Sequence, residues 1–224
     1  MSELTLNGGA AILRACISLP FAGVWSADIE VDTDEDITGA VTIEVDGAVS
    51  LRGAVVDGGV THGLWRGRLV GGAGGLRRPL PALAYLDALR SDVVRDALAE
   101  AGEALSSTAG DLSAVVARFH RAEGAAARAI DATAAALGYG WRVLGDGTVW
   151  LGVETWPASP EADITLLEHN PRERRYTLGG EVLGVRPGQL LQVRDEGTDV
   201  FVRVGVVRLE VEPDRFTATV WAAP

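Results

Sequence analysis

The fold is decided by the stretch from Gly138 to Trp156, which reads GYGWRVLGDGTVWLGVETW. An alanine-rich helical pattern runs into it, and Gly138 is expected to end that helix because glycine readily adopts the left-handed conformation of a helix end. Two strands are predicted next, at Trp141–Leu144 and Thr148–Thr155. They are joined by Gly145-Asp146-Gly147, and Asp-Gly between apolar runs is a strong hairpin signal. The chain therefore leaves a helix here and begins a second set of strands.

The bulk properties are those of a folded protein of one large or two small domains. The chain has 224 residues, of which 47% are hydrophobic and 23% charged. No run approaches the roughly 20 apolar residues of a membrane-spanning helix. The N-terminus shows no basic region followed by an apolar stretch, so we expect no secretory signal and synthesis in the cytoplasm of a bacterial host.

The composition excludes several kinds of site. All 20 basic residues are arginine, so no lysine is present for a phosphate-binding loop, a Schiff base or a general base. The net charge of -11 argues against nucleic-acid binding, because phosphate contacts need a basic face. Cys16 is the single cysteine, so neither an internal disulfide nor a cysteine cluster for zinc is possible. We interpret it as a small filler residue in a strand.

The first third of the chain alternates between apolar and polar residues, which is typical of half-exposed strands. The alternating runs are Trp25–Asp32, Val41–Asp46, Val49–Val55 and Trp65–Leu69. Turns are predicted at Asp46-Gly47 and at Asp57-Gly58-Gly59. Strands of this kind, joined by short turns, form antiparallel sheets that curl into a barrel or a sandwich.

The middle of the chain reads as helical. Gly71–Gly75 is expected to be a flexible loop, and Ser91 an N-cap for a helix over Asp92–Ala101 that ends at Gly102. Apolar periodicity also predicts helices over Asp111–Phe119 and Ala125–Leu137.

The last third returns to strands, with no clear residue-level repeat of the first third. Beyond the hairpin, strands are predicted at Ala162–Leu167, Arg175–Leu178, Leu190–Arg194, Val200–Glu212 and Phe216–Trp221. The run Val200–Glu212 changes its apolar face partway, which predicts a bulge or sharp bend at Gly205. Turns are predicted at Asn170-Pro171, Arg186-Pro187-Gly188, Glu196-Gly197 and Pro213-Asp214.

The order of strands, helical insert and strands resembles one family, the hub and late-control proteins of phage-tail baseplates and related contractile injection systems. The resemblance is carried by Gly67–Gly72, Ser91–Gly102 and Ala125–Trp156. It implies a mainly β fold of two small antiparallel β-barrels joined by helices, with boundaries at 1–80, 81–138 and 139–224.

The same resemblance implies a structural role and no enzymatic activity. Three subunits would form a ring in which six barrels match a hexameric tail tube, within the tail of a virion or particle. The expected partners are further copies of the chain, the tail tube, the tape-measure protein and the spike or baseplate proteins. Such a ring would have an acidic-walled channel that repels passing DNA.

An acidic run could suggest a calcium site, and it comprises Asp28, Glu30, Asp32, Asp34, Glu35 and Asp36. Asp32-x-Asp34-x-Asp36 matches the start of an EF-hand loop. Ile37 then stands where the loop requires glycine, and Ile43 stands where it requires a bidentate glutamate. We therefore interpret the run as a solvated strand edge and loop, whose charges discourage unwanted strand pairing.

No catalytic, cofactor-binding or metal-binding residues are predicted. The glycines at 71–75 could cradle a phosphate, but the Lys-Ser/Thr that would follow is missing, so a connector is expected. His62, His120 and His169 are scattered and match no triad or metal spacing. The 31 acidic residues offer many accidental carboxylate pairs, and nothing singles out one pair.

The six tryptophans leave a second function open. Trp25, Trp65, Trp150 and Trp221 lie in strand patterns and are expected in the core. Trp141 and Trp156 border turns and are candidates for exposed contacts. The alternative function is therefore a β-rich module that binds a carbohydrate or a host surface.

The helical segment Ser91–Leu137 has narrow, alanine-rich apolar stripes, whose burial yields little free energy. We therefore expect it to be loosely held in a free subunit and fixed against a neighbour in the assembly, with hydrogen exchange slowing on assembly.

Overall fold

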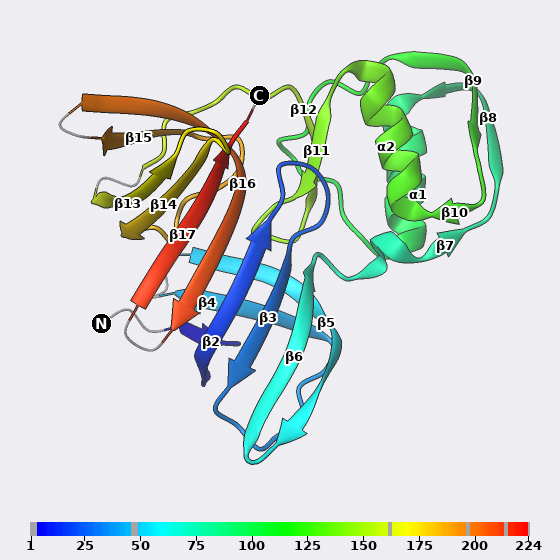
Figure 1. Cartoon of the computed structure of the whole chain (residues 1–224). Coiled ribbons are helices and arrows are strands. Elements are labelled where there is room, and N and C mark those ends of the chain that lie inside the picture. Colours follow the sequence, from blue (N-terminus) through cyan, green and yellow to red (C-terminus); the bar gives the residue numbers. More distant parts are fainter. Residues whose placement is uncertain (1–3, 46–48, 161–162, 196–197, 213–214, 224) are drawn as a thin grey trace.

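The computed structural model describes all residues except 1–3, 46–48, 161–162, 196–197, 213–214 and 224. Strands dominate it, and two α-helices lie side by side at one end (Figure 1). Within the described residues, no helix has the length and apolarity that crossing a membrane would require. The turns predicted at Asp46-Gly47, Glu196-Gly197 and Pro213-Asp214 lie outside the described residues.

The first strand region forms a closed six-stranded barrel. Its strands run in the order β1-β4-β5-β6-β3-β2, and pairing of β1 with β2 closes the ring. Their bounds are β1 Leu4–Leu6, β2 Ala10–Leu19, β3 Ser26–Val31, β4 Ala40–Val45, β5 Val49–Thr61 and β6 Leu64–Gly71. The predicted alternation is confirmed here, because the apolar residues of β3 point inward while its polar residues point outward.

Two tryptophans fill this barrel, and glycines make room for them. Trp65 is fully buried and Trp25 is 2% exposed. A Cβ added at Gly58 would lie 2.4 Å from the ring of Trp65. The turn predicted at Asp57-Gly58-Gly59 is therefore wrong, since this stretch lies inside β5. The actual turn follows at His62 and Gly63, which both have positive φ angles.

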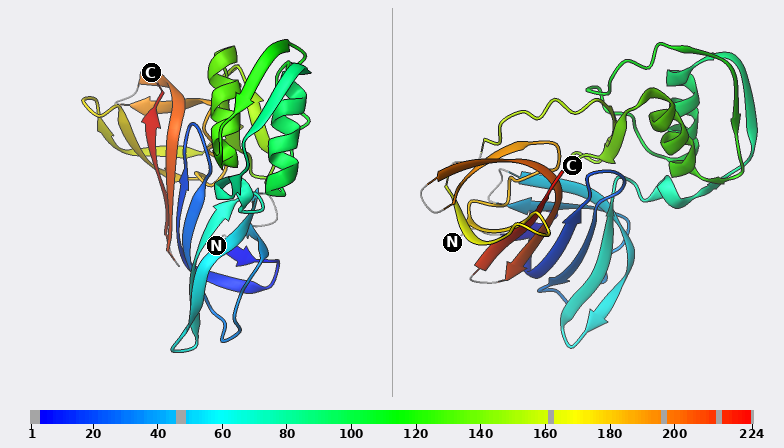
Figure 2. Two further views of the ribbon diagram at one scale, coloured as in Figure 1. Left: turned by 90° about the vertical axis from the view of Figure 1, so that its right-hand side faces the viewer. Right: turned by 45° about the horizontal axis from the view of Figure 1, so that its top comes forward.

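The last third forms a second curled unit, in the order β15-β16-β17-β14-β13 (Figure 2, right). Its strands are β13 Ile164–Asn170, β14 Arg175–Gly180, β15 Leu190–Asp195, β16 Thr198–Glu212 and β17 Arg215–Ala222. The predicted bulge at Gly205 is confirmed, because the β16–β17 register shifts between Val204 and Val206. Among the described residues, no ladder joins β13 to β15, although a single bridge links Ala158 to Leu190.

The two units repeat one topology. Strands β2 to β6 pair as β4-β5-β6-β3-β2, and strands β13 to β17 pair as β15-β16-β17-β14-β13. Thus β2 corresponds to β13, β3 to β14, β4 to β15, β5 to β16 and β6 to β17.

The repeat extends to irregular features of the backbone. β2 and β13 both carry a register shift, after Ile12 and after Leu166. β5 and β16 both carry one as well, after Val55 and after Val204. Val55 N–H donates to a carbonyl just before β4 at 2.9 Å, and Val204 N–H donates to the equivalent carbonyl before β15 at 2.8 Å. The repeat lies in backbone pairing rather than in residue identity, so the sequence does not reveal it.

A shared junction fuses the two units into one sheet. Strand β2 pairs antiparallel with β16, from Leu19 opposite Val207 to Ala15 opposite Val211. The sheet therefore runs without interruption from the first barrel into the second unit (Figure 1).

The insert between the units stands to one side of the strands (Figure 2). It comprises η1 Gly75–Arg77, β7 Pro79–Leu80, β8 Leu83–Leu89, α1 Arg90–Ala101, β9 Val115–Arg121, β10 Gly124–Ala125, α2 Ala126–Leu137, β11 Gly140–Val143 and β12 Val149–Gly152. The helix ending at Gly138 and the hairpin after it are confirmed. The helix ending at Gly102 is also confirmed, but it begins at Arg90, so Ser91 is not its N-cap.

The helix predicted over Asp111–Phe119 is wrong, because β9 occupies Val115–Arg121 and pairs with β8. β-Branched and aromatic residues favour a strand there. Arg121 fixes the arrangement, since it is 3% exposed and donates to Glu100 of α1 at 2.8 Å.

The apolar stripes of both helices are buried within the single chain. Val94, Leu98 and Ile130 are at most 1% exposed and belong to the main hydrophobic core. The expectation that these stripes are held mainly by a neighbouring subunit is therefore wrong. The boundaries at residues 80 and 138 stay a prediction.

We therefore expect hydrogen exchange to be slow in α1 and α2 already in the free subunit. The β8–β9 ribbon should exchange faster than the helices, because it has only two strands and one of its faces is exposed. Leu86 and Val115 on this ribbon are 70% and 62% exposed. Exchange of the helices as fast as that of the ribbon, measured by mass spectrometry, would contradict this.

Candidate functional site

The glycine loop after β6 does bind an anion, but the anion is a side chain of the chain itself. The carboxylate of Glu103 accepts hydrogen bonds from the N–H groups of Ala73, at 2.9 Å, and Gly75, at 2.7 Å. Gly72 and Gly74 have positive φ angles of 76° and 81°. Successive N–H groups in such a conformation form an anion-binding nest. Glu103, 9% exposed, fills the nest, so no phosphate site remains at these N–H groups.

The acidic run has a structural use. The carboxylate of Asp36 accepts a hydrogen bond from the indole N–H of Trp65 at 3.2 Å, which ties the β3–β4 connection to the barrel. Asp28 and Glu30 lie on the outer face of β3. Across the residues that the structure describes, no group of three or more His, Cys, Asp or Glu side chains could hold a metal ion.

The histidines lie on separate elements, as their spacing predicts. His62 is in the β5–β6 turn, His120 is on β9, and His169 on β13 stacks against Tyr176 at 4.4 Å between ring centroids. Two pKa shifts have clear causes elsewhere. Burial raises the pKa of Tyr85, and hydrogen bonds from Ser113 lower the pKa of Asp111. These groups do not form a nucleophile–base pair of the kind that catalysis requires.

The tryptophans offer no open sugar platform at the two expected positions. Trp141 is 6% exposed and donates its indole N–H to Asp131 at 2.6 Å, so its predicted exposure is wrong. Trp156 is half-buried. The ring of Phe21 stacks on it, with 5.7 Å between ring centroids, and the guanidinium carbon of Arg203 lies 5.4 Å from the centroid of the Trp156 ring.

Of the tryptophans expected in the core, Trp25 and Trp65 are buried, as predicted. Trp150 and Trp221 are half-buried. Trp150 donates its indole N–H to the carbonyl of Thr108, and Arg142 lies over its ring.

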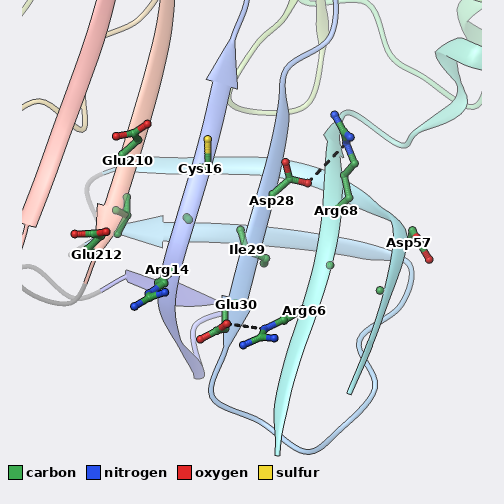
Figure 3. A pocket seen from close by; sticks show the side chains of 14 residues that line it. Arg14, Cys16, Asp28, Ile29, Glu30, Asp57, Arg66, Arg68, Glu210 and Glu212 are labelled. Carbon is green, nitrogen blue, oxygen red and sulfur yellow. Dashed lines mark hydrogen bonds and ion pairs between the residues drawn. The ribbon is translucent and has the colours of Figure 1, made fainter. Parts of the chain in front are cut away.

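A shallow groove of about 690 Å3 lies on the outer face of the shared sheet. It crosses β16, β2, β3, β6 and β5 and therefore spans the junction between the two units (Figure 3). The alternation of each strand creates it, because Ile17, Ile29 and Leu209 point into the core while their neighbours point outward.

Charges of both signs line this groove. The arginines are Arg14, Arg66 and Arg68, and the acids are Asp28, Glu30, Asp57, Glu210 and Glu212. Two ion pairs cross between β3 and β6. Glu30 Oε2 lies 2.6 Å from Arg66 Nε, and Asp28 Oδ1 lies 3.9 Å from Arg68 Nε. Exposed pairs of this kind contribute about 0–1 kcal/mol to stability. The groove is therefore a polar surface, and none of the other residues that the structure describes covers it.

The chain is similar to known proteins in its fold but not in its sequence. No family model and no curated protein matches the sequence. Solved structures do match. The 43 kDa tail protein of prophage MuSo2 from Shewanella oneidensis superposes with a TM-score of 0.76 at 11% identity, over 100% of this chain and 98% of that one. The chain has the fold of phage tail proteins.

Two further structures agree. A tail protein from Neisseria meningitidis has a TM-score of 0.69 at 14% identity, over 99% of this chain and 96% of that one. An Escherichia coli component of the type VI secretion system is described as similar to the phage T4 tail proteins gp27 and gp5. It superposes with a TM-score of 0.68 at 11% identity, over 99% of this chain and 77% of that one. The resemblance that the sequence indicated is confirmed at the level of the fold.

Proposed function

We propose that the chain is a structural hub of a phage tail or tail-like particle, which forms a ring of three copies between the tail tube and the distal spike or tip. One observation carries the proposal. The chain contains two units of the same topology, and they are joined side by side through unlike strands, β2 of the first and β16 of the second.

A junction of unlike strands can be repeated from copy to copy. Because β13 corresponds to β2 and β5 corresponds to β16, each copy has a second pair of matching edges at its two ends. Contacts between unlike surfaces either close into a ring or continue as a filament. The resemblance to tail hubs favours closure at three copies, that is, six units around the axis.

The polar face of the shared sheet is our proposed channel wall. Its two signs of charge revise the acidic channel expected from the net charge alone. Arg66 and Arg68 are paired with Glu30 and Asp28, so they are less available to bind phosphate. Such a wall would let DNA pass without holding it.

The partners follow from this role. They are further copies of the chain, the tube, the tape-measure protein and the spike or baseplate proteins, all within the tail. The role is geometric and needs no enzymatic activity or cofactor.

Native mass spectrometry and negative-stain electron microscopy test the proposal directly. We expect trimers and three-fold rings with six lobes, either for the purified protein at high concentration or after addition of its tube protein. A chain that stays monomeric under both conditions would overturn the ring.

A further inference from the structure

We propose that the β13 end of one copy docks against the uncovered edge of β5 in the next copy, in the register of the β2–β16 junction. The inference rests on the proposed ring and names its contact surface.

The register can be transferred because the bulges align the two units. Leu13 of β2 corresponds to Leu167 of β13, and Val56 of β5 corresponds to Gly205 of β16. In the junction within the chain, Cys16 lies opposite Glu210. Counting from the bulges, the equivalent residues are Asn170 in one copy and Thr61 in the next.

The receiving edge on β5 has no strand paired with it among the described residues, whereas the equivalent edge of β16 is paired with β2. β4 pairs with β5 only as far as Ala54, and Val55 bonds to the carbonyl of Gly39. Beyond that point, no strand in the described part of the chain lies along this edge. Val56 and Val60 there are 55% and 40% exposed. The equivalent edge of β16 is the one that β2 occupies.

The incoming edge comprises the last residues of β13 and the β13–β14 turn, because Ala15 to Leu19 of β2 correspond to residues 169–173. It is equally unpaired. Among the described residues, β13 forms a ladder with β14 alone. Its bulge residue Leu167 is 50% exposed. The β13–β14 turn that follows carries exposed Arg172 and Arg174.

The two surfaces complement each other in charge. A hollow of about 270 Å3 lies beside the β5 edge, lined by residues that include Ile37, Val55 and Val56, with the exposed carboxylates of Asp36 and Asp57 at its side. In the transferred register the β13–β14 turn, and not Leu167, lies beside Asp57, so its arginines face the hollow. Unpaired edges, matching registers and opposite charges together identify a second copy of this chain as the occupant.

Disulfide trapping tests the register. In a Cys16→Ser background, Thr61→Cys with Asn170→Cys should form covalent trimers under mild oxidation, because the Cα atoms of opposed strand residues lie within disulfide range. Glu210→Cys with native Cys16 is the positive control within one chain. Thr61→Cys with Thr165→Cys is the off-register control, displaced along β13 by about 16 Å at 3.3 Å per residue.

Native mass spectrometry on the same reduced samples separates the possible failures. Rings that form without trapping of the Thr61–Asn170 pair would overturn this contact and leave the ring standing. Equal trapping in the off-register control would overturn the register. The absence of any ring would overturn both the contact and the proposed function.

Charge reversal gives an independent readout. Asp57→Arg should raise the concentration needed for half-assembly by about tenfold, because it opposes like charges at the contact. Adding Arg172→Asp to the same chain should restore assembly, since every contact then holds one residue of each sign. Asp57 is exposed, so folding should be unaffected. An unchanged assembly curve for both variants would contradict the proposed contact.

Discussion

Gly67→Ala is expected to lower the free energy of unfolding by about 3 kcal/mol, which is the upper end for overpacking a well-filled core. An added Cβ would lie 2.1 Å from the ring of Trp65. The ring is fully buried and its indole N–H is bonded to Asp36, so it cannot turn away without losing that bond. Urea unfolding followed by tryptophan fluorescence measures the change.

Gly59→Ala is the matched control for this substitution. Gly59 lies on the neighbouring strand directly opposite Arg66, and nothing lies within 4 Å of a Cβ added there. We expect a change within about 0.5 kcal/mol, as for surface substitutions away from special contacts. Equal losses of stability in the two variants would mean that the ring of Trp65 does not decide the need for glycine.

These glycines explain why one turn could not be predicted from the sequence. Asp57-Gly58-Gly59 has the composition of a turn, but Gly58 is small because Trp65 crosses it from β6. That contact depends on strand pairing, which local sequence does not contain. The actual turn at His62-Gly63 carries a weaker local signal, since a histidine with positive φ is uncommon.

Elements with strong local signals were predicted well. The hairpin around Asp146-Gly147 and the helix ends at Gly102 and Gly138 follow from backbone preferences that act within a few residues. The stretch Asp111–Phe119 failed because its apolar spacing suits a helix, while its pairing with β8, far away in the sequence, makes it a strand.

Part of the candidate groove could also be predicted from local sequence, and part of it depends on strand pairing. Alternation along β3 and β6 predicts a charged outer face, but only the β2–β16 pairing brings Glu210 next to Cys16 and joins the faces of the two units. The duplication was invisible because corresponding positions share backbone pairing rather than residue type. Ile29 and Tyr176, for example, are equivalent by register, although one is aliphatic and the other aromatic.

Glu103→Ala is expected to lower the free energy of unfolding by about 3 kcal/mol, because two N–H groups lose a charged acceptor in a buried place. The affected donors are the N–H groups of Ala73 and Gly75. The loop cannot refold around the gap easily, since an added Cβ at Gly75 would lie 1.8 Å from the carbonyl oxygen of Ala101.

Two companion variants make the effect of the Glu103 carboxylate specific. Glu103→Gln keeps one acceptor oxygen and should cost roughly half as much, since bonds to a neutral acceptor are weaker than bonds to a charged one. Glu123→Ala removes an exposed acid in the same insert and should leave stability within about 0.5 kcal/mol of the parent. Thermal unfolding of the three variants gives the order of their stabilities. If Glu103→Ala unfolds like Glu123→Ala, the two hydrogen bonds from Ala73 and Gly75 do not stabilise the loop, and the proposed structural role of the Glu103 carboxylate is wrong.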